Sequence, residues 1–413
     1  MEKNNDAKYV ILLGDGMADL PVESLGGKTP LEYASTPNMD RLAATGILGL
    51  ARTVPEGMQP GSDIANLSVL GYNPRDFFSG RAPLEAINMG IELGPRDLAI
   101  RCNMVDIRDG VMQDFSAGHI SSEFSAVIMK ELAKNITLPD MEYFPGVSYR
   151  NIVLWRNYPH QDLPETIPPH DIQGKQVTPY LPRANGADIL NRIMKESADI
   201  IASSPAVRDV KSKCKGSPAS VWLWGCGRKP SMETLGKRFG LRGYTISAVD
   251  LVHGLGRAAG LSPIQVPGAT GYIDTNYAGK TRALLEALKN ASFIFLHVES
   301  PDESGHEGSL EHKLSAIEDF DSKIVGPVMD GISAYRDYTV LVMPDHPTPI
   351  SIRTHTGDPV PFCMYSSKGW DGTAFQGMSA PSFSEKSAAA TGLFIAEGHR
   401  LIELMLYKKL QLR

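Results

Sequence analysis

Three apolar runs, each followed closely by residues that can bind metal ions, constrain this chain more than any other feature of its sequence. They are Val10–Leu13 before Asp15, Phe293–His297 before Asp302 and His306, and Val340–Met343 before Asp345, His346 and His355. Ligands bind α/β sheets outside the carboxyl ends of the strands, so these side chains should share one edge. Carboxylate and imidazole donors together suit one or two divalent cations. The sequence therefore predicts a metalloenzyme.

Short apolar runs alternate with helical patterns along most of the chain, which is typical of an α/β fold with helices flanking a mainly parallel sheet. The expected strands are Tyr9–Leu13, Val221–Trp224, Tyr244–Val249, Phe293–Val298 and Thr339–Met343. Thr36 and Pro37 form a typical helix start, and Gly46 ends that helix.

The middle of the chain differs in texture. Residues 83–216 are richer in proline and in short alternating stretches, and a Lys/Ser/Gly segment, Lys211–Ser217, follows. This pattern predicts an inserted smaller α+β domain over 83–216 within a discontinuous core domain of residues 1–82 and 217–413. A chain of 413 residues is long enough for two such domains.

Composition argues against several classes of protein. A net charge of −6, without a basic face interleaved with aromatic residues, argues against nucleic-acid binding. No stretch approaches the roughly 20 apolar residues of a membrane span, and Met1–Lys8 is polar, so we expect a cytoplasmic protein. Four cysteines without a CxxC spacing argue against disulfides and a zinc ribbon.

Taken singly, each candidate ligand has an ordinary interpretation. Asp302 and His306 can be a solvated pair in a polar loop, His346 can cap a helix, and His355 can be a surface histidine. Two clusters of aspartate and histidine and a third aspartate, all at strand ends, are hard to attribute to chance. Their coincidence favours a shared metal site.

Ser62 is the candidate nucleophile. It lies in Pro60–Leu67, where it should begin a helix whose free N–H groups and dipole favour a phosphate. Serine is also a common helix cap, so the position alone means little. A divalent cation lowers the pKa of a hydroxyl enough for attack at neutral pH, and Ser62 is therefore credible only together with the metal ligands.

These residues resemble those of the alkaline phosphatase superfamily and, within it, the archaeal-type branch of cofactor-independent phosphoglycerate mutases. The superfamily resemblance rests on Leu12–Gly16, Thr36–Leu42, Pro301–His306, Asp345–His346 and His355–Gly357. The branch resemblance rests on Gly61–Asn66 with Gly71 and Tyr72, Ser116–Ser121, Ser148–Arg150, Pro168–Asp171, Trp222–Gly225 and Gly268–Gly271.

The resemblance implies an alkaline-phosphatase-like core with an inserted lid domain, and an isomerase of glycolysis and gluconeogenesis. Such an enzyme interconverts 3- and 2-phosphoglycerate through a phosphoserine, without added 2,3-bisphosphoglycerate. One ion would be held by Asp302, His306 and His355, and the other by Asp15, Ser62, Asp345 and His346. The family favours Mn²⁺, while the donor types leave Zn²⁺, Co²⁺ and Mg²⁺ open.

The inserted domain would close over the site, because a phosphoserine exposed to water would hydrolyse. Arg101 and Arg150 are candidates for binding the substrate carboxylate, since guanidinium pairs with carboxylates in a bidentate way. His119 is a candidate donor or proton shuttle. Arg228 and Lys280, expected on the metal-bearing domain, are candidates for contacting phosphoryl oxygens.

Several alternatives share the same core. They are another metal-dependent phosphotransferase, of the phosphopentomutase or homoserine kinase type, and a plain phosphatase acting on a small phosphate ester. A sulfatase would need a Cys/Ser-x-Pro-x-Arg motif, which the residues around Ser62 lack. A non-catalytic binding protein on a retired metallophosphatase scaffold is disfavoured because every expected ligand is present.

Overall fold

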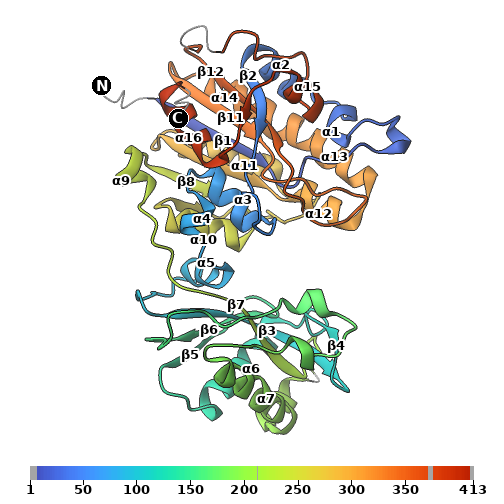
Figure 1. The fold of residues 1–413 in the computed structure, drawn as a ribbon, viewed down its shortest axis with the longest axis vertical. Coiled ribbons are helices and arrows are strands. Elements are labelled where there is room, and N and C mark those ends of the chain that lie inside the picture. The colour runs from blue at the N-terminus through green and yellow to red at the C-terminus, as the bar shows by residue number, and fades with distance from the viewer. Residues whose placement is uncertain (1–6, 212, 371–374, 410–413) are drawn as a thin grey trace. The chain divides into compact units, whose positions relative to one another are not determined.

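A computed structural model describes residues 7–211, 213–370 and 375–409, and the chain divides into two compact units. The core unit comprises residues 1–78 and 232–413, and the inserted unit comprises residues 79–231. Each has its own sheet and its own cluster of buried apolar side chains (Figure 1).

The core unit contains an eight-stranded sheet in the order β13-β2-β12-β11-β1-β10-β8-β9. All neighbouring pairs are parallel except those of β12, which runs antiparallel to β11 and β2. This confirms the predicted mainly parallel α/β class. The strands are β1 (Lys8–Gly14), β2 (Ile47–Ala51), β8 (Gly243–Ile246), β9 (Ser262–Ile264), β10 (Phe293–Val298), β11 (Tyr338–Met343), β12 (Val360–Ser366) and β13 (Phe394–Ile395).

Helices accompany this sheet. They are η1 (Glu23–Leu25), α1 (Pro30–Tyr33), α2 (Pro37–Thr45), α3 (Ser62–Val69), α4 (Pro74–Phe77), α9 (Leu235–Phe239), α10 (Asp250–Ala258), α11 (Tyr277–Ala287), α12 (Ser300–Glu307), α13 (Leu310–Phe320), the π-helix η4 (Asp321–Val325), α14 (Gly326–Ile332), α15 (Glu385–Ala390), η6 (Gly398–Arg400) and α16 (Leu401–Tyr407).

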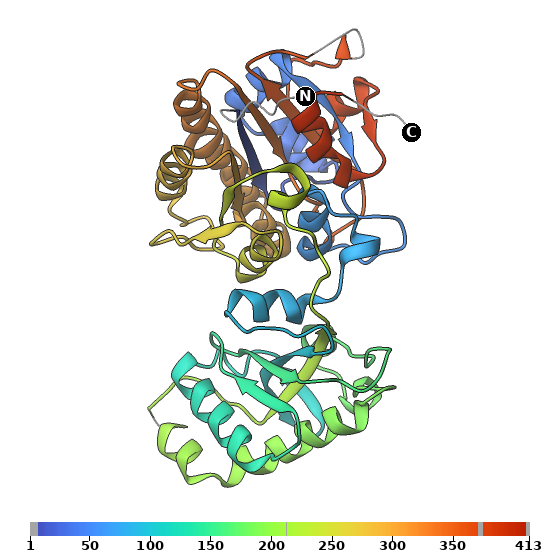
Figure 2. The ribbon, with the colours of Figure 1, turned by 90° about the vertical axis from the view of Figure 1, so that its left-hand side faces the viewer.

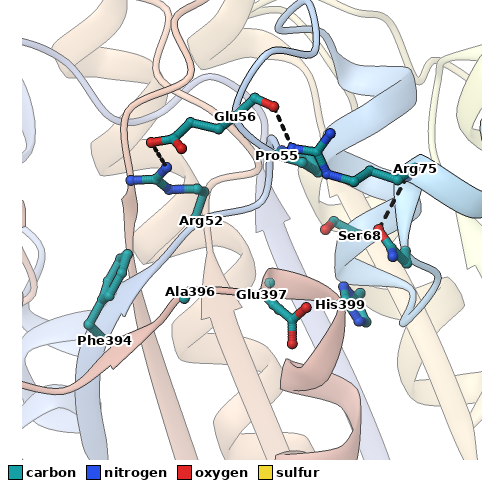
Figure 3. Close-up of a pocket in the computed structure, with 11 residues that line it drawn as sticks. Arg52, Pro55, Glu56, Ser68, Arg75, Phe394, Ala396, Glu397 and His399 are labelled. Atoms are coloured by element: carbon teal, nitrogen blue, oxygen red, sulfur yellow. Dashed lines mark hydrogen bonds and ion pairs between the residues drawn. The ribbon is translucent and has the colours of Figure 1, made fainter.

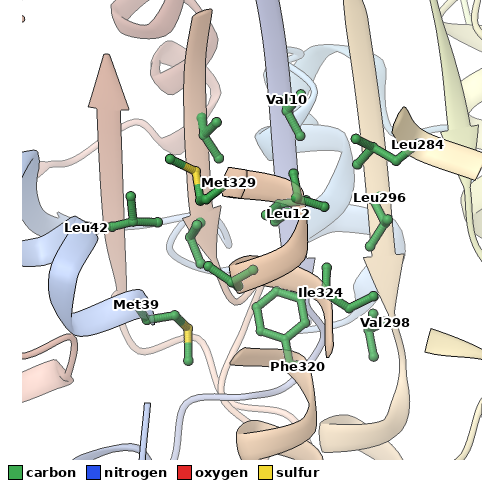
Figure 4. Close-up of a cluster of buried hydrophobic side chains, with 14 of the residues drawn as sticks. Val10, Leu12, Met39, Leu42, Leu284, Leu296, Val298, Phe320, Ile324 and Met329 are labelled. Atoms are coloured by element: carbon green, nitrogen blue, oxygen red, sulfur yellow. The ribbon is translucent and has the colours of Figure 1, made fainter. Parts of the chain in front are cut away.

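The main apolar cluster lies between the central strands and the helical segment formed by α13, η4 and α14 (Figure 4). Val10 and Leu12 of β1, two residues apart, belong to it because alternate residues of a strand share one face. Phe320 and Ile324 pack on them from the helical side and, like them, are fully buried. Burying this many apolar side chains fixes the central strands firmly in register.

The register of the central strands brings their ends together. Leu13 pairs with His297 of β10 on one side and with Met343 of β11 on the other. The backbone N–H of Asp15 then bonds the carbonyl of Val298 at 2.9 Å. The residues just beyond β1, β10 and β11 therefore lie at the same edge of the sheet.

The inserted unit has a separate antiparallel sheet, in the order β4-β3-β6-β5 with β7 also paired to β3. Helices α6 and α7 lie along one face of it (Figure 2). Its elements are α5 (Arg81–Asn88), β3 (Leu98–Arg108), β4 (Val111–Asp114), α6 (Ser122–Asn135), β5 (Met141–Phe144), β6 (Arg150–Trp155), η2 (Pro169–Ile172), η3 (Thr178–Tyr180), α7 (Ala187–Ser203), α8 (Pro205–Lys211) and β7 (Ser220–Gly227).

The run Val221–Trp224 forms a strand as expected, but it belongs to the other sheet. As β7 it pairs with β3, with Trp222 opposite Asn103, so the chain returns to the core unit only after residue 231. The return was predicted at residue 217. The physical reason is that an apolar run indicates a buried strand without indicating which sheet buries it.

The other four predicted strands are confirmed as β1, β8, β10 and β11, although β8 ends at Ile246 rather than Val249. Within the residues that the structure describes, no helix is both long enough and apolar enough to cross a bilayer.

Candidate metal centre

Residues from the three strand ends converge in the core unit. Among the described residues, three groups of donors have ligand atoms within 4.8 Å of one another: Asp302, His346 and His355; Asp15, Asp345 and His346; and Asp15, His297 and Glu299. His346 belongs to the first two groups and Asp15 to the last two, so the groups form one continuous cluster. The predicted ligands therefore lie together, as a pair of cations roughly 4 Å apart would require.

The first group is built around Asp302, on the first turn of α12. His306 follows one turn later, and its Nε2 lies 3.2 Å from Asp302 Oδ2. His355 Nε2 lies 3.6 Å from Asp302 Oδ1 and only 3.0 Å from His306 Nε2. His306 Nδ1 lies 3.0 Å from the carbonyl of Arg353, to which it must donate its proton, so the neutral ring presents a lone pair at Nε2. Two ring nitrogens facing each other this closely need a proton or a cation between them.

The second group surrounds His346, whose Nε2 lies 3.5 Å from Asp15 Oδ1 and 3.4 Å from Asp345 Oδ2. Its tautomer follows from its neighbour. The Thr348 hydroxyl donates to Asp302 and therefore accepts from His346 Nδ1, at 3.2 Å. Nε2 of the neutral ring is then left with a lone pair aimed at the two carboxylates, as in a metal ligand with its outer partner in place.

Ser62 joins this second group. Its Oγ lies 3.2 Å from His346 Nε2, and it is the first residue of α3, as its sequence context predicts. All eight residues of α3 are buried. Asn66, one turn later, donates to Asp345 Oδ2 and to the Ser62 carbonyl, both at 2.8 Å. The helix start and the metal donors are therefore tied together through Asn66.

Burial and charge shift the ionisation of the cluster strongly. Burial raises the pKa of Asp15 well above its ordinary range, and neighbouring carboxylates add to the effect. Burial likewise raises the pKa of Glu299 to about 8. Burial also opposes ionisation of Asp302, but hydrogen bonds from His306 and His355 outweigh it and hold its pKa well below the usual value. The pKa of His306, lowered by burial, is raised to about 9 overall by its bond to Asp302.

Two observations test whether divalent cations fit these donors. Asp15 Oδ1 is buried without a hydrogen-bond partner, and so is Asn66 Oδ1 close by. An unpaired buried carboxylate oxygen is costly, and a cation removes that cost. The donor set of carboxylates and imidazoles suits Mn²⁺, Zn²⁺ or Co²⁺. The residues therefore fit a divalent metal centre.

Two buried lysines lie under the cluster. Lys313 donates to the carbonyls of Gly16 and Thr348, at 2.5 and 3.1 Å. Lys280, a predicted phosphoryl contact, is fully buried in α11, and its Nζ donates to the carbonyl of His297 at 3.0 Å. Burial lowers the pKa of Lys280 to about 8. In this structure its ammonium group supports the backbone behind the donors.

Gly16 separates Asp15 from Asp302. It has a φ of +57°, and a Cβ placed there would lie 2.5 Å from both Asp302 Oδ1 and Thr348 Oγ1. Its N–H donates to Asp345 Oδ1 at 3.1 Å. The close approach of the first strand end to the α12 carboxylate therefore requires glycine.

The four other predicted substrate contacts lie in the inserted unit. Arg101 is 8% exposed, pairs with Glu85 at 3.0 Å and lies over the Trp224 ring at 4.1 Å. Arg150 is exposed at the start of β6, and His119 is exposed as well. Arg228, expected on the metal-bearing domain, lies instead in this unit because β7 carries it there, and it donates to the carbonyls of His160 and Gln161.

A hollow of about 390 Å³ in the core unit lies apart from these donors (Figure 3). Its two arginines are engaged within its own wall, where Arg52 pairs with Glu56 at 2.6 Å and Arg75 donates to the Glu56 carbonyl. The predicted ligands do not line it. The hollow is therefore separate from the candidate metal centre.

Sequence reasoning missed two members of the cluster, His297 and Glu299. His297 ends an apolar strand, and its Nε2 lies 2.7 Å from Asp15 Oδ2 and 3.5 Å from Glu299 Oε2. The available signal was a histidine inside an otherwise apolar buried run.

The fold and the donors first define a class, that of α/β proteins with a candidate divalent-metal centre at the sheet edge and a serine hydroxyl beside it. A model of the 2,3-bisphosphoglycerate-independent phosphoglycerate mutase family matches residues 43–206. Mutases of that name from Methanothrix thermoacetophila and Methanosarcina barkeri are 50% and 44% identical to this chain, each over 97% of it, covering 99% and 100% of the relatives. The chain belongs to this family.

Two solved structures share the fold. A Pyrococcus horikoshii protein has a TM-score of 0.79 at 26% identity, covering 99% of both chains. The cofactor-independent phosphoglycerate mutase of Thermoplasma acidophilum has a TM-score of 0.64 at 23% identity, covering 97% of this chain and 99% of that one.

Proposed function

We propose that this protein interconverts 3-phosphoglycerate and 2-phosphoglycerate without added 2,3-bisphosphoglycerate, through a phosphoserine on Ser62. The observation that carries the proposal is the Ser62 hydroxyl, 3.2 Å from His346 Nε2 within a cluster of metal donors. Family relatives covering nearly the whole chain carry the same activity in their names.

Asp302, His306 and His355 would hold one divalent cation, and Asp15, Ser62, Asp345 and His346 the other. When bound, such ions neutralise phosphate oxygens and lower the pKa of the serine hydroxyl. Mn²⁺ is the proposed ion.

The transfer has two balanced halves. Ser62 Oγ attacks the phosphorus in line, the bond from phosphorus to the substrate 3-oxygen breaks, and the Ser62 proton ends on that oxygen as a glycerate hydroxyl. The glycerate then turns, its 2-hydroxyl attacks the phosphoserine, and its proton returns to Ser62. The dipole of α3, which begins at Ser62, favours the phosphate in both halves.

The inserted unit is proposed as the lid that holds the glycerate. Aromatic and imidazole rings join motifs that are far apart in its sequence, with neighbouring centroids 5.4 to 6.4 Å apart in the series His119, Tyr149, Phe115, His170 and Trp224. Arg150 lies over the Tyr149 ring, near one end of this series, and Arg101 lies over the Trp224 ring at the other end. A patch with two guanidinium groups suits a carboxylate.

The turn that carries His119 supports this role. Ala117, Gly118 and His119 have φ of 51°, 74° and 50°, so three consecutive residues are left-handed. Asp114 stabilises the turn by accepting from the N–H groups of Ser116 and Gly118. Backbone strain of this kind concentrates at functional sites. Arg228 and Lys280 donate to backbone carbonyls, so their proposed role is to hold the backbone of their own units in place.

The test is a substrate panel on Mn²⁺-loaded protein, read by phosphorus NMR and by an enolase-coupled assay. We expect 3-phosphoglycerate to reach equilibrium with 2-phosphoglycerate without release of inorganic phosphate. Release of phosphate alone would identify a phosphatase, and transfer to another hydroxyl compound would identify a different phosphotransferase. Either result would overturn the proposal.

A further inference from the structure

A hydrogen-bonded series of buried residues connects His253, which is not one of the metal donors, to Asp15 through Ser247 and His297. His297 Nε2 lies 2.7 Å from Asp15 Oδ2, and His297 Nδ1 lies 3.1 Å from Ser247 Oγ. The Ser247 hydroxyl also accepts from the N–H of Val249 at 2.9 Å, and its carbonyl lies 3.0 Å from His253 Nε2. None of the four side chains is more than 1% exposed.

The partners fix where the proton of His297 lies. With a cation on Asp15 the carboxylate is ionised and can only accept, so Nε2 must carry the proton and donate it to Asp15. Nδ1 of the neutral ring then has a lone pair and accepts from Ser247. The Ser247 oxygen keeps a lone pair for the N–H of Val249. Every donor in the series therefore has an acceptor.

His297 differs in this respect from His306 and His346. Those two rings donate through Nδ1, to the Arg353 carbonyl and to Thr348, so in their neutral, metal-binding form the lone pair is at Nε2. His297 has the opposite arrangement, with its proton on Nε2. The same ring nitrogen is thus a potential ligand in two histidines and a donor in the third.

The donation by His297 leaves the two oxygens of Asp15 unequal. Oδ2 accepts from His297, whereas Oδ1 is the buried oxygen without a hydrogen-bond partner, 3.5 Å from His346 Nε2. We propose that His297 is a positioning residue that makes Asp15 a one-oxygen ligand of the Asp15, Asp345 and His346 group, and that Ser247 fixes the tautomer that allows it. This inference rests on the proposed metal site and deepens it.

A competing arrangement is a third cation bound by Asp15, His297 and Glu299. Binding through Nε2 would move the His297 proton to Nδ1, facing Ser247. The Ser247 oxygen would then accept from both His297 and Val249, and its own proton would lose the acceptor it has now. The observed contacts therefore favour the donor role.

The test compares variants that keep or remove the donor. His297→Leu removes it, whereas His297→Gln keeps an N–H near the position of Nε2. We expect His297→Leu to bind two Mn²⁺ at saturation, with one of the two affinities lowered about 10- to 100-fold, and His297→Gln to restore most of that loss. Calorimetric titration and electron paramagnetic resonance of Mn²⁺ measure this without any turnover.

Two further variants keep the test sharp if His297→Leu does not fold. Ser247→Ala should lower the same affinity by a smaller factor, about 3- to 10-fold, because the ring loses its fixed tautomer. His312→Gln is the matched control, since His312 also bonds a carboxylate, Glu307 at 2.9 Å, but lies outside the donor groups. It should bind Mn²⁺ as wild type does.

Activity provides the second readout. For His297→Leu, kcat should fall and recover in part as Mn²⁺ is raised, while KM stays close to the wild-type value. Unchanged Mn²⁺ affinity in both His297→Leu and Ser247→Ala would overturn the proposal. So would a third Mn²⁺ in wild type that His297→Leu loses, because His297 would then be a ligand. Absence of mutase activity would affect only the proposed function.

Discussion

Buried carboxyl groups in the two units have pKa values shifted in opposite directions. In the core unit, burial raises the pKa of Asp15 well above its ordinary range and that of Glu299 to about 8. In the inserted unit, burial also acts against the ionised forms of Asp97 and Asp114, but N–H and hydroxyl donors outweigh it and their pKa values are lowered. Asp97 and Asp114 are therefore stabilised as ions within the inserted unit, whereas the carboxylates gathered in the core unit lack such partners, an arrangement that suits the proposed cations.

Asp302 is the exception in the core unit and sharpens the comparison. Its pKa is held low by His306 and His355, the two histidines expected to bind the ion with it. Hydrogen bonds from these imidazoles stabilise the ionised carboxylate of Asp302, as a bound cation would. A donor cluster that can take up either protons or metal is consistent with metal binding that releases protons.

The largest predicted effect is the loss of the nucleophile. Ser62→Ala should lower kcat by at least about 10⁴-fold, because no other hydroxyl replaces the attacking oxygen. Circular dichroism should show an unchanged fold, and the enolase-coupled assay measures the rate. Ser68→Ala is the matched control, since Ser68 lies on the same helix and is 1% exposed. If Ser62→Ala retained a substantial rate, Ser62 would not be the nucleophile and the proposed phosphoserine would be wrong.

The next effect tests the inserted unit. Arg150→Gln should raise the KM for 3-phosphoglycerate about 10- to 100-fold with a smaller change in kcat, because a carboxylate loses one charged partner. Arg192→Gln is the control, since Arg192 is exposed in the same unit and pairs only locally with Glu196 at 2.6 Å. Equal KM values for the two variants would argue against a carboxylate-binding patch formed by Arg101 and Arg150.

Metal removal should destabilise the core unit more than the inserted unit. Binding at 100 times Kd stabilises a protein by about 2.7 kcal/mol per site, so chelation should lower the stability of the core unit by that order. Hydrogen exchange should show reduced protection in β1, β10 and β11 and little change in β3 and β6. A uniform loss of protection across both sheets would contradict the contrast drawn above.

A smaller effect should appear when one carboxylate is removed. Without metal, the free energy of unfolding of Asp15→Asn should exceed that of wild type by about 1 kcal/mol. The reason is that the substitution removes a buried carboxylate that has no cation to neutralise it. With saturating Mn²⁺ the order should reverse, since wild type gains binding energy that the variant lacks. Denaturant titrations with and without Mn²⁺ measure both.

The smallest effect concerns pH in the inserted unit. The pKa of Asp97 is lowered in the folded protein because Gly94, Arg156 and Asn157 donate to it. A lowered folded pKa contributes stability above the unfolded value, which is lost as pH falls through the folded value. Asp97→Asn should therefore cost about 1 kcal/mol at pH 7 and less near pH 3, because the advantage shrinks once the unfolded carboxyl is protonated. Unfolding curves at the two pH values test this.

Much of the core unit could be predicted from the sequence, because apolar runs with ligand residues just beyond them specify both the strands and the edge at which they end. Asp15, Asp302 and Asp345 meet for that reason. The position of β7 could not be predicted in this way, since Val221–Trp224 would fit the interior of either sheet equally well. Arg228, close to the end of that strand, was misplaced with it.

The outer partners of the donors were harder to predict. His297 and Lys280 act on groups distant in sequence, and nothing local distinguishes a histidine that donates from one that binds an ion. Whether Lys280 points to solvent or to the His297 carbonyl depends on how α11 packs. Such roles depend on which ring nitrogen carries the proton, and this is determined by partners that only the folded structure brings together.

The glycine at position 16 has a consequence for engineering this enzyme. Because a methyl group there would strike both Asp302 and Thr348, the close approach of the first strand end to Asp302 depends on the absence of a side chain at position 16. Gly16→Ala would force the donors apart and could be read as a change in the magnetic coupling of two Mn²⁺ ions. A single methyl group at this position would thus change the geometry of the donors without replacing any of them.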